Sequence, residues 1–96
     1  MDRTIYLNNL YDYYSSLLTD KQRLYYEDYY FSNLSLAEIA ENYKVSRNAV
    51  HNQLKIAESK LEYYEENLKL YDKRLKILEI TDRLDIDVKN KIEELI

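Results

Sequence analysis

The chain of 96 residues contains no glycine, proline, cysteine or tryptophan, and one histidine, His51. Without glycine it has neither a phosphate-binding P-loop nor the glycine-rich turn that binds dinucleotides. Without cysteine it has no disulfide, no thiol catalysis and no cysteine-based zinc site, and a lone histidine does not complete a zinc site without carboxylates. Tight hairpin turns, which favour Gly or Asn at positive φ, are also disfavoured. We therefore expect an all-α protein with no metal and no cofactor.

Acidic residues outnumber basic residues by 18 to 14, which gives a net charge of −4. The chain as a whole therefore does not attract nucleic acid or anionic lipid. No apolar run approaches the roughly 20 residues that span a bilayer, and the first residues lack the apolar core of a signal peptide. We expect a cytoplasmic protein without membrane insertion.

Capping residues mark the starts of the predicted helices. Apolar residues at three- and four-residue spacing predict a first helix over about residues 4–18. Thr19 with Gln22, and Ser35 with Glu38, have the spacing of capping boxes. They predict a second helix from residue 20 to about 32 and a third from 36 to about 43.

Ser46 is the predicted N-cap of a fourth helix that meets no helix-breaking residue before about Ile80. Its apolar residues alternate by four and three, a 3.5-residue period typical of coiled coils. A second column of apolar residues, each seven positions from the next, widens the apolar face of this helix. Asp87 is the predicted cap of a last helix. The later part of the alternating pattern, which we name the seam, consists of Leu61, Tyr64, Leu68, Tyr71, Leu75 and Leu78.

An apolar stripe of this length needs to be covered by the first helix, by a second copy of the chain, or by both. We predict a homodimer, in which residues 61–96 continue the fourth helix and form a dimerisation arm. A single chain that folds its first and last helices back is the alternative. The charges that flank the seam leave parallel and antiparallel dimers open.

Residues 35–57 have the layout of a helix-turn-helix, within a predicted head of residues 1–60. The first short helix directs Ile39 and Ala40 inward, the turn buries Val45, and Val50 and Leu54 hold the second helix. The turn of such a motif usually has glycine in the left-handed conformation. Here Tyr43 or Lys44 has to adopt it, which costs roughly 1–2 kcal/mol.

Three segments carry a resemblance to a known family. SLAEIAENYKVSRNAV (residues 35–50), preceded by LTDKQR (18–23) and followed by YYEENLKLYDKRLKILE (63–79), resembles the YlxM-like helix-turn-helix family. Members of that family look like region 4 of sigma factors with an extended C-terminal helix. The resemblance covers about residues 7–79 and implies an all-α dimer, nucleic-acid binding and a link to the signal recognition particle pathway. Asp28 departs from it, since the family usually has an apolar residue there.

A helix-turn-helix reads DNA by laying the N-terminal half of its second helix in the major groove. Arginine pairs with guanine and asparagine with adenine, so the residue types on this helix suit base edges. Residues 46–60 carry three cations against one carboxylate, a net +2. The predicted nucleic-acid-binding residues are Arg47, Asn48, His51, Asn52 and Lys55, with Lys21, Arg23 and Lys44 as phosphate contacts. An ordinary solvated helix face has the same composition, and this is the competing interpretation.

Two function classes remain. The first is a DNA-binding regulatory protein, with RNA not distinguished from DNA. The second is a protein- or RNA-interacting accessory of the signal recognition particle machinery that does not bind DNA. We expect that the protein is not an enzyme, because no carboxylate lies in an apolar loop beside a nucleophile. The paired tyrosines of residues 25–30 are interpreted as core and rim residues rather than as stacking platforms for single strands.

Overall fold

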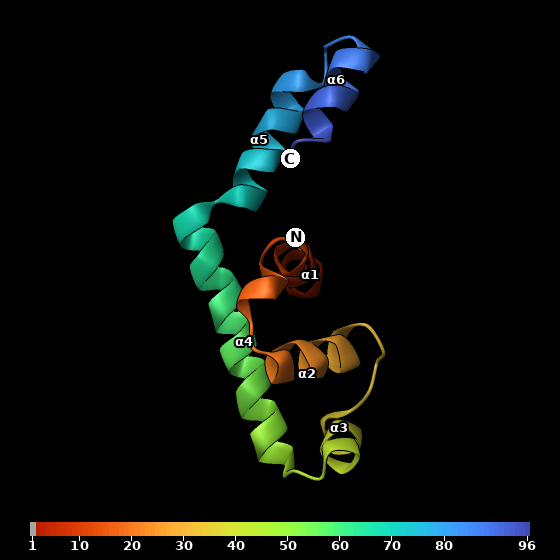
Figure 1. Cartoon of the computed structure of the whole chain (residues 1–96), viewed down its shortest axis with the longest axis vertical. Coiled ribbons are helices and arrows are strands. Elements are labelled where there is room, and N and C mark those ends of the chain that lie inside the picture. The colour runs from red at the N-terminus through yellow and green to blue at the C-terminus, as the bar shows by residue number, and fades with distance from the viewer. Residues whose placement is uncertain (1) are drawn as a thin grey trace.

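The computed structural model describes residues 2–96, and in that range all of its regular structure is helical. This confirms the all-α prediction. Figure 1 shows that the longest helix, α4, runs along one side of the molecule, with α1, α2 and α3 packed against it and α5 and α6 beyond its C-terminal end. The elements are α1 (Arg3–Tyr14), the 3₁₀ turn η1 (Ser15–Leu17), α2 (Asp20–Tyr30), α3 (Leu36–Tyr43), α4 (Arg47–Leu68), α5 (Leu70–Thr81) and α6 (Ile86–Glu93).

The capping chemistry behaves as the sequence predicts. Thr19 Oγ1 accepts from the backbone N–H of Gln22, and Gln22 Oε1 accepts from the N–H of Thr19, at 3.2 and 3.0 Å. Ser35 and Glu38 form the same reciprocal pair at the start of α3. Ser46 Oγ accepts from the N–H of Ala49 at 3.0 Å and begins α4. Each pair satisfies backbone donors that a helix leaves unpaired at its first turn.

The ends of three helices differ from the prediction. The first helix ends at Tyr14 and tightens into η1 instead of continuing to Leu18, and α2 ends at Tyr30. Asp85, not Asp87, is the residue before α6, so Asp87 lies inside the first turn of that helix. A helix ends where the chain has to turn in order to pack, and the local sequence is a poor predictor of that position.

The core lies where α1, α2 and α3 meet the inner face of α4. Tyr26 is fully buried, and its ring stacks on that of Tyr11 with 4.5 Å between the ring centres. Tyr25 is also buried, which agrees with the interpretation of these tyrosines as core residues. Asp28, the departure from the family pattern, is half-buried and accepts a hydrogen bond from the hydroxyl of Tyr43 at 3.0 Å. The polar partner explains how a carboxylate is tolerated there.

The prediction of one unbroken helix from Ser46 to about Ile80 is wrong. α4 ends at Leu68, Lys69 adopts the left-handed conformation (φ 56°, ψ 31°), and α5 begins at Leu70. The chain bends visibly at this point in Figure 1.

Two side chains satisfy the backbone at the bend. The hydroxyl of Tyr14 accepts from the N–H of Leu70 at 3.0 Å and donates to Glu65 Oε1 at 2.6 Å. The buried carboxylate of Glu65 also accepts from the N–H groups of Tyr71 and Asp72, at 3.1 and 2.9 Å. A carboxylate at a helix N-terminus also interacts favourably with the helix dipole. We name this arrangement the Tyr14–Glu65 clamp.

The seam is partly covered by the chain itself. Leu61 is fully buried in the core, and Tyr71 packs against Tyr6 and Asn9 of α1. These two residues therefore belong to the interior of a single chain, which corrects their assignment to an exposed dimer seam. Tyr64 and Leu78 are half-buried, and Leu68 and Leu75 are exposed. Homodimerisation stays a prediction.

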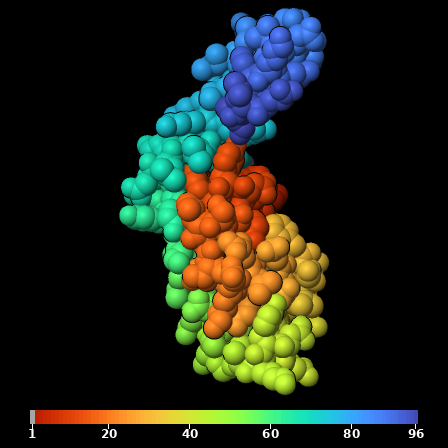
Figure 2. All heavy atoms as spheres, in the orientation of Figure 1, coloured from red at the N-terminus to blue at the C-terminus, as the bar shows by residue number. Residues whose placement is uncertain are grey.

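The later part of α5 and the whole of α6 project from the rest of the molecule, as the blue region of Figure 2 shows. α6 folds back along α5, with Lys89 3.6 Å from Asp82 and the hydroxyl of Tyr13 donating to the Ile96 carbonyl at 2.9 Å. The molecule measures 53 × 25 × 23 Å, with a radius of gyration of 16.5 Å. A compact chain of this length would have about 12 Å. Among residues 2–96, none of the helices combines the length and apolar content that a membrane span requires.

Candidate nucleic-acid interface

The helix-turn-helix consists of α3, a short turn and α4. Lys44 takes the left-handed conformation (φ 56°, ψ 45°), so the prediction that Tyr43 or Lys44 does so is confirmed. Its backbone N–H and that of Val45 close the end of α3 on the carbonyls of Ala40 and Glu41. The half-buried Val45 then fixes the turn against the core, and Ser46 begins the next helix.

The first two and a half turns of α4 have two distinct sides. Val50 and Leu54 are buried in the core, at 0% and 4% exposure. The opposite side is exposed to solvent, and we name it the recognition face. It consists of Arg47, Asn48, His51, Asn52 and Lys55, all of them exposed.

The recognition face has no polar partner among residues 2–96. The ion pairs and side-chain hydrogen bonds formed within residues 2–96 involve none of its five residues, and none involves the exposed side chain of Lys44. Its donors are therefore available to a ligand. Lys44 lies immediately before this face and adds a further free cation.

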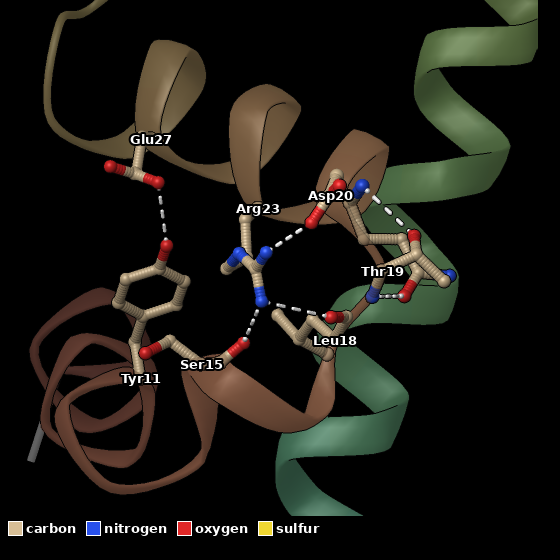
Figure 3. Close-up of polar contacts among 8 residues, drawn as sticks. Tyr11, Ser15, Leu18, Thr19, Asp20, Arg23 and Glu27 are labelled. Atoms are coloured by element: carbon tan, nitrogen blue, oxygen red, sulfur yellow. Dashed lines mark hydrogen bonds and ion pairs between the residues drawn. The ribbon is translucent and has the colours of Figure 1, made fainter.

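Arg23 has a different role from the predicted phosphate contact. Figure 3 shows its guanidinium directed at the end of the first helix. Its Nη1 donates to the carbonyls of Ser15 and Leu18, at 3.5 and 3.2 Å, and its Nη2 pairs with Asp20. A planar group with five donors suits the unpaired carbonyls that a helix leaves at its C-terminal end. Arg23 is therefore a capping residue of the fold and not a free cation.

Lys21 is exposed but is not brought next to Arg47. The neighbouring Gln22 donates to Gln53 Oε1 at 3.2 Å and accepts from Lys60 Nζ at 3.2 Å. The start of α2 therefore lies beside the middle of α4, about 9 Å or more along the helix from Arg47. Lys60 is a cation of α4 that counts towards the net charge of residues 46–60 and lies on a flank of the seam, but it is not among the residues predicted for the nucleic-acid interface.

A recess of about 250 Å³ borders the recognition face where α2, α3 and α4 meet. His51 and Lys55 line it, with Tyr29, Tyr30, Leu36, Leu54 and Glu58. The hydroxyl of Tyr30 donates to Glu58 Oε2 at 2.7 Å. Burial, followed by that hydrogen bond, raises the pKa of Tyr30 above its ordinary value.

Glu58, which lines this recess, and Glu62 one turn later on α4 are both paired with a cation from α1. Arg3 Nη2 lies 3.7 Å from Glu58 and 2.7 Å from Glu62. An adjacent cation reduces the repulsion that these carboxylates would exert on a polyanion. Residues 2–96 contain no group of three histidine or carboxylate side chains arranged to hold a metal ion.

Comparison with known proteins places these features in a family. The model of the family described as "Putative helix-turn-helix protein, YlxM / p13 like" (UPF0122) matches residues 1–96. A UPF0122 protein of Halalkalibacterium halodurans is 46% identical over 97 residues, covering 99% of this chain and 89% of the relative. One of Geobacillus kaustophilus is 48% identical over 84 residues, covering 88% of this chain and 76% of the relative.

A UPF0122 protein of Shouchella clausii is 50% identical over 66 residues, which cover 69% of this chain and 61% of the relative. The shared region in the first two relatives includes most of the chain, and the family model covers all of it. The chain therefore belongs to the UPF0122 family of helix-turn-helix proteins.

Proposed function

We propose that this protein is a non-enzymatic regulatory protein that binds double-stranded DNA, with the first half of α4 in the major groove. The observation that carries the proposal is the recognition face, whose Arg47, Asn48, Asn52 and Lys55 side chains are exposed and unpaired within the chain. Among the arginines of residues 2–96, Arg3 and Arg23 form ion pairs, whereas Arg47, Arg74 and Arg83 do not.

The ligand class follows from the shape of the element that presents these side chains. The major groove of B-form DNA accepts an α-helix. The major groove of double-stranded RNA is deep and narrow, and side chains do not read it. An exposed helix with arginine and asparagine in its first turn therefore fits duplex DNA better than duplex RNA.

The electrostatic contribution is small for each subunit. Lys44, Arg47 and Lys55 are the free cations at this face, and the chain as a whole has a charge of −4. With three phosphates neutralised, the logarithm of the affinity falls with the logarithm of the salt concentration with a slope of about −3. Binding without sequence recognition is therefore weak and confined to low salt.

Fluorescence anisotropy tests the proposal, with a labelled DNA duplex of random sequence and the matching RNA duplex at two salt concentrations. We expect the protein to bind the DNA duplex more tightly, and Arg47→Glu to weaken binding about tenfold or more, because it places a carboxylate next to phosphate. Arg83→Glu is the matched control, since Arg83 is an exposed arginine beyond α5. Equal loss in both variants, or no binding at low salt, would refute the proposal.

The second candidate is an accessory of the signal recognition particle machinery that binds protein or RNA and not DNA. The family resemblance suggests the machinery, and exposed apolar residues on α5 and α6 favour a protein ligand. If no DNA binds while Leu75→Asp abolishes an activity in the cell that Arg47→Glu preserves, this candidate replaces the first.

A further inference from the structure

The outer side of α4 carries a groove of about 370 Å³ directly after the recognition face. It is lined by Ile56, Ser59, Lys60 and Tyr63, with Lys55 at its edge. The first four residues have the spacing i, i+3, i+4 and i+7. Four residues at this spacing form the hole that receives one side chain of a facing helix in knobs-into-holes packing. We name these four residues the α4 hole.

The α4 hole is empty of the chain's own side chains. Ile56 and Tyr63 are 43% and 62% exposed, although both lie within a helix whose other face is tightly packed. Within residues 2–96, the one ring contact of Tyr63 is edge-on with the neighbouring Tyr64. The hole therefore presents an apolar floor that none of the described helices covers.

The edge of the hole is positively charged. Lys60 Nζ is held by Gln22 Oε1 at 3.2 Å, and Lys55 is exposed and unpaired within the described chain. No carboxylate lines the groove. An apolar side chain flanked by acidic residues is complementary to such a site in both shape and charge.

One exposed apolar residue of the chain has this character. Ile86 is 65% exposed and lies between Asp85 and Asp87. Among the large exposed apolar residues of positions 2–96, it alone has a carboxylate on each side. It stands at the start of α6, a helix that contributes no buried residue to its own chain.

We propose that the α4 hole binds α6 of a second copy of this chain, with Ile86 of that copy entering between Ile56 and Tyr63. Asp85 and Asp87 of the second copy then lie beside Lys60 and Lys55. A two-fold axis makes the contact reciprocal, so that a dimer contains it twice and closes. This interface uses none of the seam residues, of which Leu61 and Tyr71 are buried in the single chain.

The proposed contact and the proposed DNA site share one residue, because Lys55 belongs to the recognition face and also lines the groove. In this respect alone the inference rests on the proposed function, and we expect DNA and the second copy to compete for Lys55. Self-association itself is measured without DNA, so the two proposals fail separately.

Sedimentation equilibrium of the full chain tests the interface. We expect the wild-type chain to dimerise, and Ile86→Asp to weaken dimerisation about tenfold or more, because a buried anchor residue is replaced by a charge. Val88→Asp is the matched control: it makes the same change two residues further along α6, on another face, at a side chain that is also exposed. Circular dichroism confirms that each variant keeps its helices.

A mixing experiment tests the charge pairing. We expect the double variant Lys55→Glu/Lys60→Glu alone and the double variant Asp85→Lys/Asp87→Lys alone to dimerise weakly. Mixed together, they form a heterodimer in which one contact is reversed in sign and the other is unchanged, so dimerisation returns. A monomeric wild type, a dimer that survives Ile86→Asp, equal loss with Val88→Asp, or no recovery on mixing would each overturn the proposal.

Discussion

The parts of this protein before and after the bend use similar apolar patterns with different results. In the head, taken here up to the bend as residues 2–68 instead of the predicted 1–60, Leu10, Tyr26 and Leu61 have no exposed surface. In the arm, residues 70–96, Tyr71 and Thr81 are buried, whereas Ile80 and Leu95 are 76% and 85% exposed. The head therefore forms a core by itself, and the arm leaves apolar surface that a partner can cover. Apolar periodicity predicts that a helix has a face to be covered, but it does not predict which part of the protein or which partner covers that face.

The largest expected difference between head and arm concerns stability. Leu61→Ala removes a fully buried side chain, so we expect the free energy of unfolding to fall by about 3 kcal/mol. Ile80→Ala removes a side chain that is 76% exposed, so we expect a change within about 0.5 kcal/mol. Urea unfolding followed by circular dichroism measures both. Similar losses for the two variants would show that the arm is packed as tightly as the head.

The Tyr14–Glu65 clamp is where head and arm are joined, and its loss has an intermediate effect. Glu65→Ala leaves the Tyr14 hydroxyl and the first N–H groups of α5 without their buried acceptor. We expect destabilisation of about 2 kcal/mol. Amide hydrogen exchange should become faster at Tyr71 and Asp72 and remain slow in the core of α2. Unchanged exchange at those two amides would mean that the bend does not depend on this carboxylate.

Alkaline pH probes one hydroxyl of the same clamp, with the smallest expected effect. Burial, followed by the hydrogen bond to Glu65, raises the pKa of Tyr14 to about 12, from an ordinary value of 10.0. Because the folded state holds this proton more tightly than the unfolded state, its stabilising contribution is complete below pH 10 and is lost as the pH rises towards 12.

Tyr14→Phe removes this ionisation. We expect the variant to be less stable than the wild type at pH 7, where the hydroxyl bonds are intact, and to lose less stability between pH 10 and pH 12. Urea midpoints measured across this range provide the comparison. Parallel curves for the two proteins would contradict the assignment.

Several features of the candidate site were accessible from local patterns. The outward placement of Arg47, Asn48, His51, Asn52 and Lys55 follows from the Ser46 cap and the burial of Val50 and Leu54, since a helix of fixed period separates its faces. The role of Arg23 did not follow. A surface cation and a capping cation look the same in sequence, and only the position of Ser15 and Leu18 distinguishes them.

The sequence by itself determined the helical class, the two capping boxes, the start of α4 and the left-handed turn residue, because each depends on groups within a few residues of one another. Tertiary structure decided the bend at Lys69 and the burial of Leu61 and Tyr71. The apolar repeat runs through Lys69 without interruption, and no glycine or proline marks a break. The bend is stabilised instead by Tyr14, which lies 51 residues from Glu65 in sequence, and only folding brings that pair together.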